Sequence, residues 1–384
     1  MMTDAKRLAR AYLLRVAEPP APALHRFVAE HGPIEAARRV REAAVPEAVA
    51  AETAARRGLD RAERDLDSAA EHGARLVIPE DAEWPAWPLL SLEVANGRGV
   101  TGMAPPLGLW VRGPISLDDA LDPAVAIVGA RAATDYGEHT AAEFAYELTQ
   151  SGMTVVSGAA YGIDGAAHRG TLAAEGVTVA VLGCGLDVGY PAGHVGLLNR
   201  VARRGAVVSE YPPGTQPARH RFLVRNRLIA ALSAGTVVVE AGRRSGARNT
   251  ATTAGTLGKV VMAVPGPVGS ALSVGCHRLI RDSQATLVTS VADVVESVGK
   301  VGSGLTEPGD GPRRHTDGLE PEALRVFEAL PARGGRSAEE VAVESGVELS
   351  RVRALLPALE FDGLVQRCDI GWRRRSERAG SARG

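Results

Sequence analysis

Seven short apolar runs, rich in β-branched residues, recur between residues 124 and 298 and alternate with helix-like segments. Most of the runs are continuous rather than alternating, which is typical of strands buried on both faces of a sheet. Strands that alternate with helices predict an α/β fold with a doubly wound parallel sheet. The expected strands are 124–128, 153–157, 177–182, 206–209, 236–240, 259–264 and 286–289.

The region before this pattern has a different character. Residues 1–73 are rich in Ala, Arg and Glu and lack β-branched runs, so they predict a helical domain. Residues 74–122 hold short apolar runs broken by Pro and Gly, which favours extended segments that lead into the sheet. We therefore expect one domain over 1–73 and a second over 74–298.

The C-terminal part begins with residues 299–318, whose Gly, Pro and charges without periodicity indicate a linker. Residues 319–384 then show three helical segments and a short hairpin, followed by a basic tail. Ser337 and Glu340 occupy the two positions of a capping box. Three helices and a hairpin predict a winged helix, although Pro357 interrupts the third helical segment.

Composition excludes several classes of protein. No apolar run approaches the ~20 residues that span a membrane, and the N-terminus lacks a signal-peptide pattern. The three cysteines Cys184, Cys276 and Cys368 are far apart, so neither a disulfide framework nor a C-x-x-C metal site is expected. We expect a cytoplasmic protein with no metal site, no cofactor and no membrane partner.

Positive charge is concentrated in one part of the chain. The formal net charge of the whole chain is −1. Residues 200–250 nevertheless contain ten arginines and only two acids, Glu210 and Glu240, so this window carries +8. A basic block inside a nearly neutral protein indicates an anionic partner at one place.

Small and polar residues follow the predicted strands where ligands of open parallel sheets bind, beyond the carboxyl ends. Glycines there permit tight turns, and helix N-termini beside an arginine attract anions. The residues expected to bind an anionic ligand at this edge are Gly129, Arg131, Gly158, Gly162, Ser245, Gly246 and Thr250.

Three further residues are expected to support this edge. Asp164 is predicted to cap the helix that carries His168, although the two side chains could also form an acid–base or metal pair. Glu240 is predicted to hold arginine side chains in place, with a catalytic role as the alternative. No residue is predicted to be catalytic, and Cys184 is interpreted as a small packing residue.

The stretch from 219 to 227 sets basic side chains around one aromatic ring, Phe222. Phosphate pairing combined with a surface for base stacking is what a site for single-stranded nucleic acid requires. The predicted contacts are Arg219, Phe222, Arg225, Asn226 and Arg227. The alternative is a solvated helix face with Phe222 in the core.

Several motifs, in this order and spacing, resemble those of the bacterial DNA-processing protein family DprA, also called Smf. The resemblance covers nearly the whole chain. Its motifs are V-G-A-R (128–131), S-G-A-A-Y-G-I-D-G-A-A-H-R-G (157–170), V-L-G-C-G-L-D-V-G-Y-P (181–191), S-E-Y-P-P-G (209–214), R-N-R-L-I-A-A-L-S (225–233), V-V-E-A (238–241), S-G-A-R-N-T-A (245–251) and V-P-G (264–266).

The resemblance implies a helical SAM-like N-terminal domain, an extended Rossmann-like fold and a C-terminal winged helix. It also implies a non-catalytic, dimeric protein that binds single-stranded DNA, protects incoming strands during natural transformation and loads the RecA recombinase. By motif, Arg131, Arg219, Phe222 and the segment 225–227 match the family's DNA-contacting positions. The sequence departs from the family pattern at Ala130, His194, Leu223, His277 and Ser283.

A second functional class stays open, an enzyme that acts on nucleotides. Related Rossmann-like phosphoribohydrolases carry a Gly-Gly-x-Gly-Thr-x-x-Glu loop, which residues 235–241 resemble faintly. The double glycine is missing, because Ser233 and Ala234 precede Gly235. A nucleotide hydrolysis assay separates the two classes.

Overall fold

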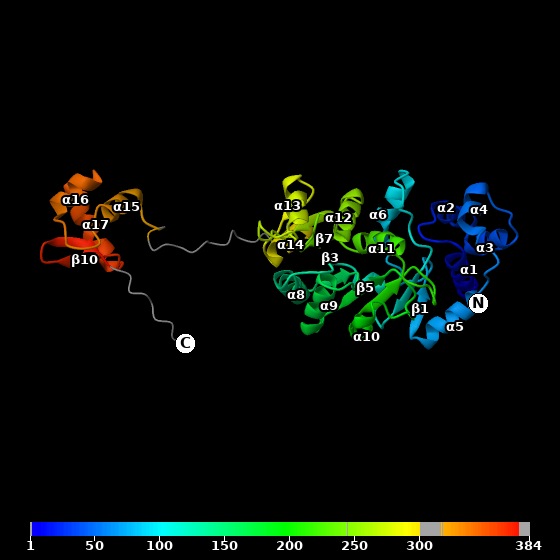
Figure 1. Cartoon of the computed structure of the whole chain (residues 1–384). Helices are drawn as coiled ribbons and strands as arrows, with labels where there is room; N and C mark the ends of the chain where they lie inside the picture. The colour runs from blue at the N-terminus through cyan, green and yellow to red at the C-terminus, as the bar shows by residue number, and fades with distance from the viewer. Residues whose placement is uncertain (1, 244, 300–315, 317, 376–384) are drawn as a thin grey trace. The chain divides into compact units, whose positions relative to one another are not determined.

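The computed structural model describes residues 2–243, 245–299, 316 and 318–375 (Figure 1). The chain divides into two compact units, 1–305 and 306–384, each of which is described by itself. Most of the predicted linker 299–318 and the last nine residues of the basic tail lie outside the described residues.

The larger unit is built on a nine-stranded sheet with the order β1-β2-β6-β5-β4-β3-β7-β8-β9. Each neighbouring pair from β6 through β9 in this order is parallel. The strands are β3 (Ala124–Val128), β4 (Thr154–Ser157), β5 (Thr178–Leu182), β6 (Ala206–Ser209), β7 (Gly235–Val238), β8 (Val260–Ala263) and β9 (Thr286–Leu287). These seven strands coincide with the seven predicted runs and confirm the doubly wound parallel arrangement.

The order in which strands are added to the sheet reverses at β3. Strands β4, β5 and β6 are added on one side of β3, and β7, β8 and β9 are added on the other. The loops after β3 and β7 therefore lead to opposite faces of the sheet and leave a crevice between them. Such a switch point is where open α/β sheets bind ligands.

The lead-in segment extends the sheet. Strands β1 (Ala74–Val77) and β2 (Leu109–Arg112) pair with each other in antiparallel fashion, and β2 pairs in the same way with β6. The sheet is therefore mixed, with an antiparallel edge on a parallel body. Helices α6 (Ala86–Gly97) and α7 (Leu117–Ala120) complete this segment.

Helices cover both faces of the sheet (Figure 1). One layer holds α8 (Asp135–Gln150), α9 (Ile163–Ala173), α10 (Val195–Arg204) and α14 (Val291–Val298), with the short 3-10 helix η1 (Ala192–His194) before α10. The opposite layer holds α6, α11 (Arg219–Ala231), α12 (Gly246–Thr256) and α13 (Val274–Arg281). Side chains such as Ile127 and Val128 are fully or almost fully buried between the layers, which explains the continuous apolar runs.

Residues 1–73 form five helices: α1 (Met2–Val16), α2 (Pro22–His31), α3 (Pro33–Arg41), α4 (Glu47–Thr53) and α5 (Ala62–Glu71). Tyr12 and Leu24 are buried among them. Their apolar core continues into the sheet unit, where it includes Trp110 on β2. Arg10 of α1 forms an ion pair with Glu80, at 2.9 Å, just after β1.

The smaller unit is a winged helix. It contains α15 (Pro321–Glu328), α16 (Ala338–Ser345), α17 (Leu349–Phe361) and the hairpin of β10 (Val365–Cys368) and β11 (Gly371–Arg374). The predicted capping box is present, because Ser337 and Glu340 each accept from the other's backbone N–H. Pro357 lies inside α17, and the helix continues past it.

Candidate nucleic-acid interface

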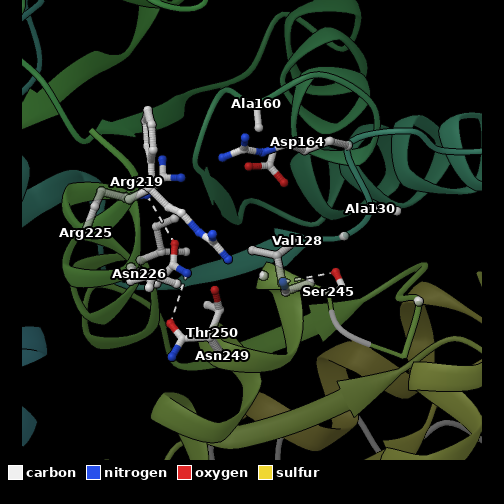
Figure 2. A pocket seen from close by; sticks show the side chains of 18 of the residues that line it. Val128, Ala130, Ala160, Asp164, Arg219, Arg225, Asn226, Ser245, Asn249 and Thr250 are labelled. Carbon is white, nitrogen blue, oxygen red and sulfur yellow. Dashed lines mark hydrogen bonds between the residues drawn. The ribbon is translucent and has the colours of Figure 1, made fainter. Parts of the chain in front are cut away.

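A cavity of about 940 Å³ opens at the switch point of the sheet. The segment after β3 forms one wall, and the segment after β7 with the start of α12 forms another (Figure 2). The start of α11 and the first turn of α9 close the remaining sides. The predicted residues that line it are Gly129, Arg131, Asp164, Arg219, Phe222, Arg225, Asn226, Ser245, Gly246 and Thr250.

The whole basic stretch from 219 to 227 lies on helix α11, whose first residue is Arg219. No side chain caps the N-terminus of α11, and Pro217 and Ala218 before it line the cavity. Backbone N–H groups in the first turn of a helix have no intrahelical acceptor and carry the positive end of the helix dipole. The uncapped start of α11 is therefore suited to bind an anion such as phosphate.

Helix α12 also begins at the cavity. Its N-cap is Ser245, whose Oγ accepts a hydrogen bond from Ala247 N at 3.2 Å. A Cβ at Gly246 would meet open space, so this position leaves room beside the helix start. Two helix N-termini thus meet at one cavity.

Aromatic and cationic side chains meet around Phe222, which is partly buried. The ring of Tyr190 lies 5.3 Å from the Phe222 ring, with 31° between their planes. The guanidinium of Arg131 lies 5.3 Å from the centre of the Phe222 ring. Because Arg131 and Arg219 are exposed, both can reach a ligand in the cavity. The group combines a stacking surface with two cations.

Arg225 has a different environment at the base of the cavity. It is 5% exposed and donates to the carbonyl oxygens of Gly158, at 2.7 Å, and of Val181. A Cβ at Gly158 would overlap the guanidinium, so glycine is required there for Arg225 to pass. Burial lowers the pKa of Arg225, while the charge of Asp164 raises it. Among the described residues no carboxylate lies within ion-pair distance of Arg225, so an anion in the cavity would compensate its charge.

Asp164 lies inside the first turn of α9, so the predicted capping role is wrong: the N-cap is Gly162. Burial raises the pKa of Asp164, against the charge of Arg225 and hydrogen bonds from the backbone of Ala160, Gly129 and Gly158. Gly162 has φ +71°, and a Cβ there would overlap the carbonyl oxygen of Ala130. Gly162 therefore serves the turn and does not line the cavity.

Asn226 is fixed by a residue that the sequence did not single out. Its Nδ2 donates to Asn249 Oδ1 at 3.1 Å, and Thr250 lies beside this pair (Figure 2). Tyr190 was likewise missed, although it belongs to the Y-P motif after β5. Both residues lie within motifs that carry the family resemblance, 245–251 for Asn249 and 181–191 for Tyr190.

Arg227 is placed away from the cavity, contrary to the predicted DNA contact. Its guanidinium donates to both carboxylate oxygens of Glu210 at 2.8 Å and to the Ala104 carbonyl at 3.0 Å. The two side chains are 2% and 5% exposed. A buried charge requires such a partner. Arg227 therefore belongs to the basic block of the sequence but does not contribute a positive charge to the cavity.

Glu240 and His168 also lie outside the cavity lining. In the described part of the chain, the Glu240 carboxylate accepts from Thr134 N at 2.9 Å and Thr134 Oγ1 at 2.6 Å, at the start of α8. None of the described arginines lies within ion-pair distance of Glu240, so the predicted contact with arginines is not seen among the described residues. His168 is fully buried and bonds Thr178 Oγ1 through Nδ1 at 2.7 Å. Burial lowers the pKa of His168 to about 3, so the ring is neutral.

The described residues show neither a metal-ligand cluster nor a membrane-spanning helix. Among them, no three His, Cys, Asp or Glu side chains could hold a metal ion together. No described helix has the length and apolar character to cross a membrane. Burial raises the pKa of Cys184 to about 11, so this thiol stays protonated and agrees with a packing role.

Comparison with known families gives two matches. The sequence model of the family described as DNA recombination-mediator protein A matches residues 75–299. The model described as DprA winged helix domain matches residues 311–369.

Individual proteins are similar over different parts of the chain. A DNA processing protein DprA from Mycobacterium tuberculosis is 50% identical over 383 residues, which cover 99% of this chain and 97% of that protein. The DNA processing protein DprA of Streptococcus pneumoniae is 42% identical over 190 residues, 50% of this chain and 66% of the relative. The X-ray structure of the S. pneumoniae protein superposes with a TM-score of 0.57 and 28% identity, covering 78% of this chain and 97% of that one.

Proposed function

The chain belongs to the DprA family of DNA-processing, recombination-mediator proteins, and from this premise we propose that it binds single-stranded DNA in the cavity at the switch point. The family and its relatives' names concern DNA processing and recombination. The cavity supplies the chemistry by which a DNA strand would be held.

One observation carries the proposal: exposed Arg131 and Arg219 stand with Phe222 at the uncapped start of α11. Phosphates would be bound by the two guanidiniums and by backbone N–H groups of the helix N-termini. A base would stack on Phe222 or Tyr190, because stacking of bases on aromatic rings accepts any base. A paired base inside a duplex does not expose its face, so this arrangement favours single strands.

Titration of the full chain with single-stranded and duplex oligonucleotides across salt concentrations tests this proposal. Neutralising about four phosphates on a single strand gives a log–log salt slope of about −3. We expect that slope together with a clear preference for the single strand. A slope near zero removes the electrostatic premise, and equal affinity for duplex removes the single-strand preference.

Four finer properties are proposed with it, and the absence of catalysis is tested by incubation with nucleoside monophosphates. The chain protects incoming strands, loads RecA onto them and works as a homodimer without catalysing a reaction. Nuclease digestion of a bound oligonucleotide tests protection, RecA filament assembly with and without the chain tests loading, and ultracentrifugation tests the dimer. A monomer over the working concentration range, or RecA assembly that the chain does not accelerate, contradicts the corresponding property.

The alternative, a nucleotide phosphoribohydrolase, has little support in the geometry. Glu240 ends the stretch that resembles the enzymes' loop, yet its carboxylate is committed to Thr134 at the start of α8. Incubation with nucleoside monophosphates decides between the two classes. Release of free base that depends on Glu240 would favour the enzyme.

A further inference from the structure

The carboxylate of Glu18, between α1 and α2, contacts basic side chains from two parts of the larger unit. It accepts from Arg221 Nε at 2.7 Å and Arg221 Nη2 at 3.1 Å, both on α11. His220 Nε2 lies 3.2 Å from the same carboxylate, and Arg56 Nη2 donates to it at 2.7 Å. Glu18 thus joins the N-terminal helices directly to the first turn of α11.

The contact remains charged over the whole physiological pH range. Burial raises the pKa of Glu18, but hydrogen bonds and charge from Arg221 and Arg56 outweigh burial and hold the pKa at about 2. Arg221 is further tied to the chain before α11, because its Nη1 donates to the Gln216 carbonyl at 2.6 Å. Arg15 reaches the same loop, with Nη2 2.7 Å from the Pro213 carbonyl.

Helix geometry relates this contact to the cavity. Successive residues of an α-helix are rotated by about 100°, so Arg219 and Phe222 lie only about 60° apart around α11. His220 and Arg221 occupy the opposite side of that turn, where Glu18 receives them. Holding His220 and Arg221 therefore fixes the rotation at which Arg219 and Phe222 face the cavity.

We propose that Glu18 is a positioning residue for single-stranded DNA binding: it locks the first turn of α11 from the N-terminal helices so that Arg219 and Phe222 meet the strand. The inference rests on the proposed function. It assigns the N-terminal helices a role in the DNA site that acts through α11, because Glu18 itself does not line the cavity.

The proposal predicts an effect opposite in sign to simple electrostatics. Removing a negative charge close to a phosphate-binding surface strengthens DNA binding at low salt. If Glu18 positions α11, Glu18→Gln weakens the binding of single-stranded DNA instead. The expected loss in affinity is about fivefold, and the salt slope becomes smaller in magnitude by about 0.7 because the contact of Arg219 is lost.

Glu35→Gln is the matched control. Glu35 lies on α3 of the same N-terminal helices and pairs with Arg38 and Arg39 on its own helix, at 2.7 Å. Its replacement removes the same charge without touching α11, so the affinity should change less than about twofold. A general loss of stability in the N-terminal helices would lower the melting temperature but leave the salt slope of the folded molecules unchanged.

The experiment measures oligonucleotide binding and hydrogen exchange of residues 211–224 in the full chain, in both variants. Weaker binding and faster exchange in Glu18→Gln alone support the proposal. Binding equal to or tighter than that of the wild-type chain, or unchanged exchange, overturns it. Failure of the wild-type chain to bind single strands contradicts the proposed function instead, while the exchange data still decide whether Glu18 holds the first turn of α11.

Discussion

Two Arg-x-Arg segments of helix α11, residues 219–221 and 225–227, have opposite environments. The first turn presents Arg219 and the partly buried Phe222 to the cavity. Farther along the helix, Arg225 and Arg227 are almost completely buried. The comparison teaches that the density of arginines in a sequence does not measure the positive charge that a ligand meets.

The difference follows from what each guanidinium contacts. The charge of Arg227 is neutralised by Glu210, whereas Arg225 donates hydrogen bonds to the carbonyl oxygens of Gly158 and Val181. A charged side chain that is removed from water needs such partners, because the free energy of desolvation otherwise exceeds the stabilisation from packing. Arg225 and Arg227 thus anchor α11 to the sheet, while Arg219 and Phe222 in the first turn remain available to a ligand in the cavity.

The largest expected effect comes from breaking the anchor. Arg227→Met leaves the carboxylate of Glu210 buried without its partner, which costs about 3–5 kcal/mol of unfolding free energy. Denaturant titration measures this loss through the midpoint. Arg219→Met is the control from the other turn, and its unfolding free energy should stay within about 0.5 kcal/mol of the wild type. Equal stability of the two variants would contradict the claim that Arg227 anchors α11 while Arg219 does not.

The next effect concerns the aromatic ring of the first turn. Phe222→Ala removes the stacking surface and should cost about 1–3 kcal/mol of affinity for single-stranded DNA. The salt slope should remain nearly constant, because no cation is lost. Oligonucleotide titration at several salt concentrations measures both quantities. If the substitution instead melts the unit in a thermal scan, Phe222 is a core residue rather than a contact.

A smaller effect is expected at a single exposed cation. Arg131→Ala should weaken binding by about 1 kcal/mol and reduce the magnitude of the salt slope by about 0.7, the value for one phosphate contact on a single strand. The same titrations measure the slope. Arg281→Ala removes an exposed arginine that pairs with Asp282 on α13 and provides the control. Loss of affinity with an unchanged slope would assign Arg131 a role other than phosphate binding.

The smallest effect is expected from the winged helix, where two arginines of α17 form exposed ion pairs. Arg351 pairs with Glu322 at 2.9 Å and Arg353 with Glu339 at 2.5 Å, so each arginine has an acidic neighbour that offsets its charge. We propose that this unit contacts a partner or plays an accessory role. Deleting 319–384 should lower affinity by less than about threefold and keep the preference for single strands. If this deletion abolished the binding of single strands, the assignment of DNA recognition to the larger unit would be wrong.

Much of the fold could be predicted because its determinants are local. Buried parallel strands require continuous apolar runs, and all seven runs became strands. The capping box at Ser337 and Glu340 formed as its spacing indicates. Position 283, where the sequence departs from the family pattern, has φ +54°, a conformation for which glycine is better suited than the serine present.

The candidate site could be predicted only in part. The sequence by itself determined that strand ends, helix starts and a basic aromatic helix would meet at one edge of the sheet, because these features follow from periodicity and chain order. Only the tertiary structure decided that Arg219 faces the cavity while Arg227 pairs with Glu210, and that Glu240 serves Thr134. Asn249 belongs to the site because its Oδ1 accepts a hydrogen bond from Asn226, which lies 23 residues earlier in the chain. Such pairings depend on which distant groups share a buried space, and the residue types alone do not contain that information.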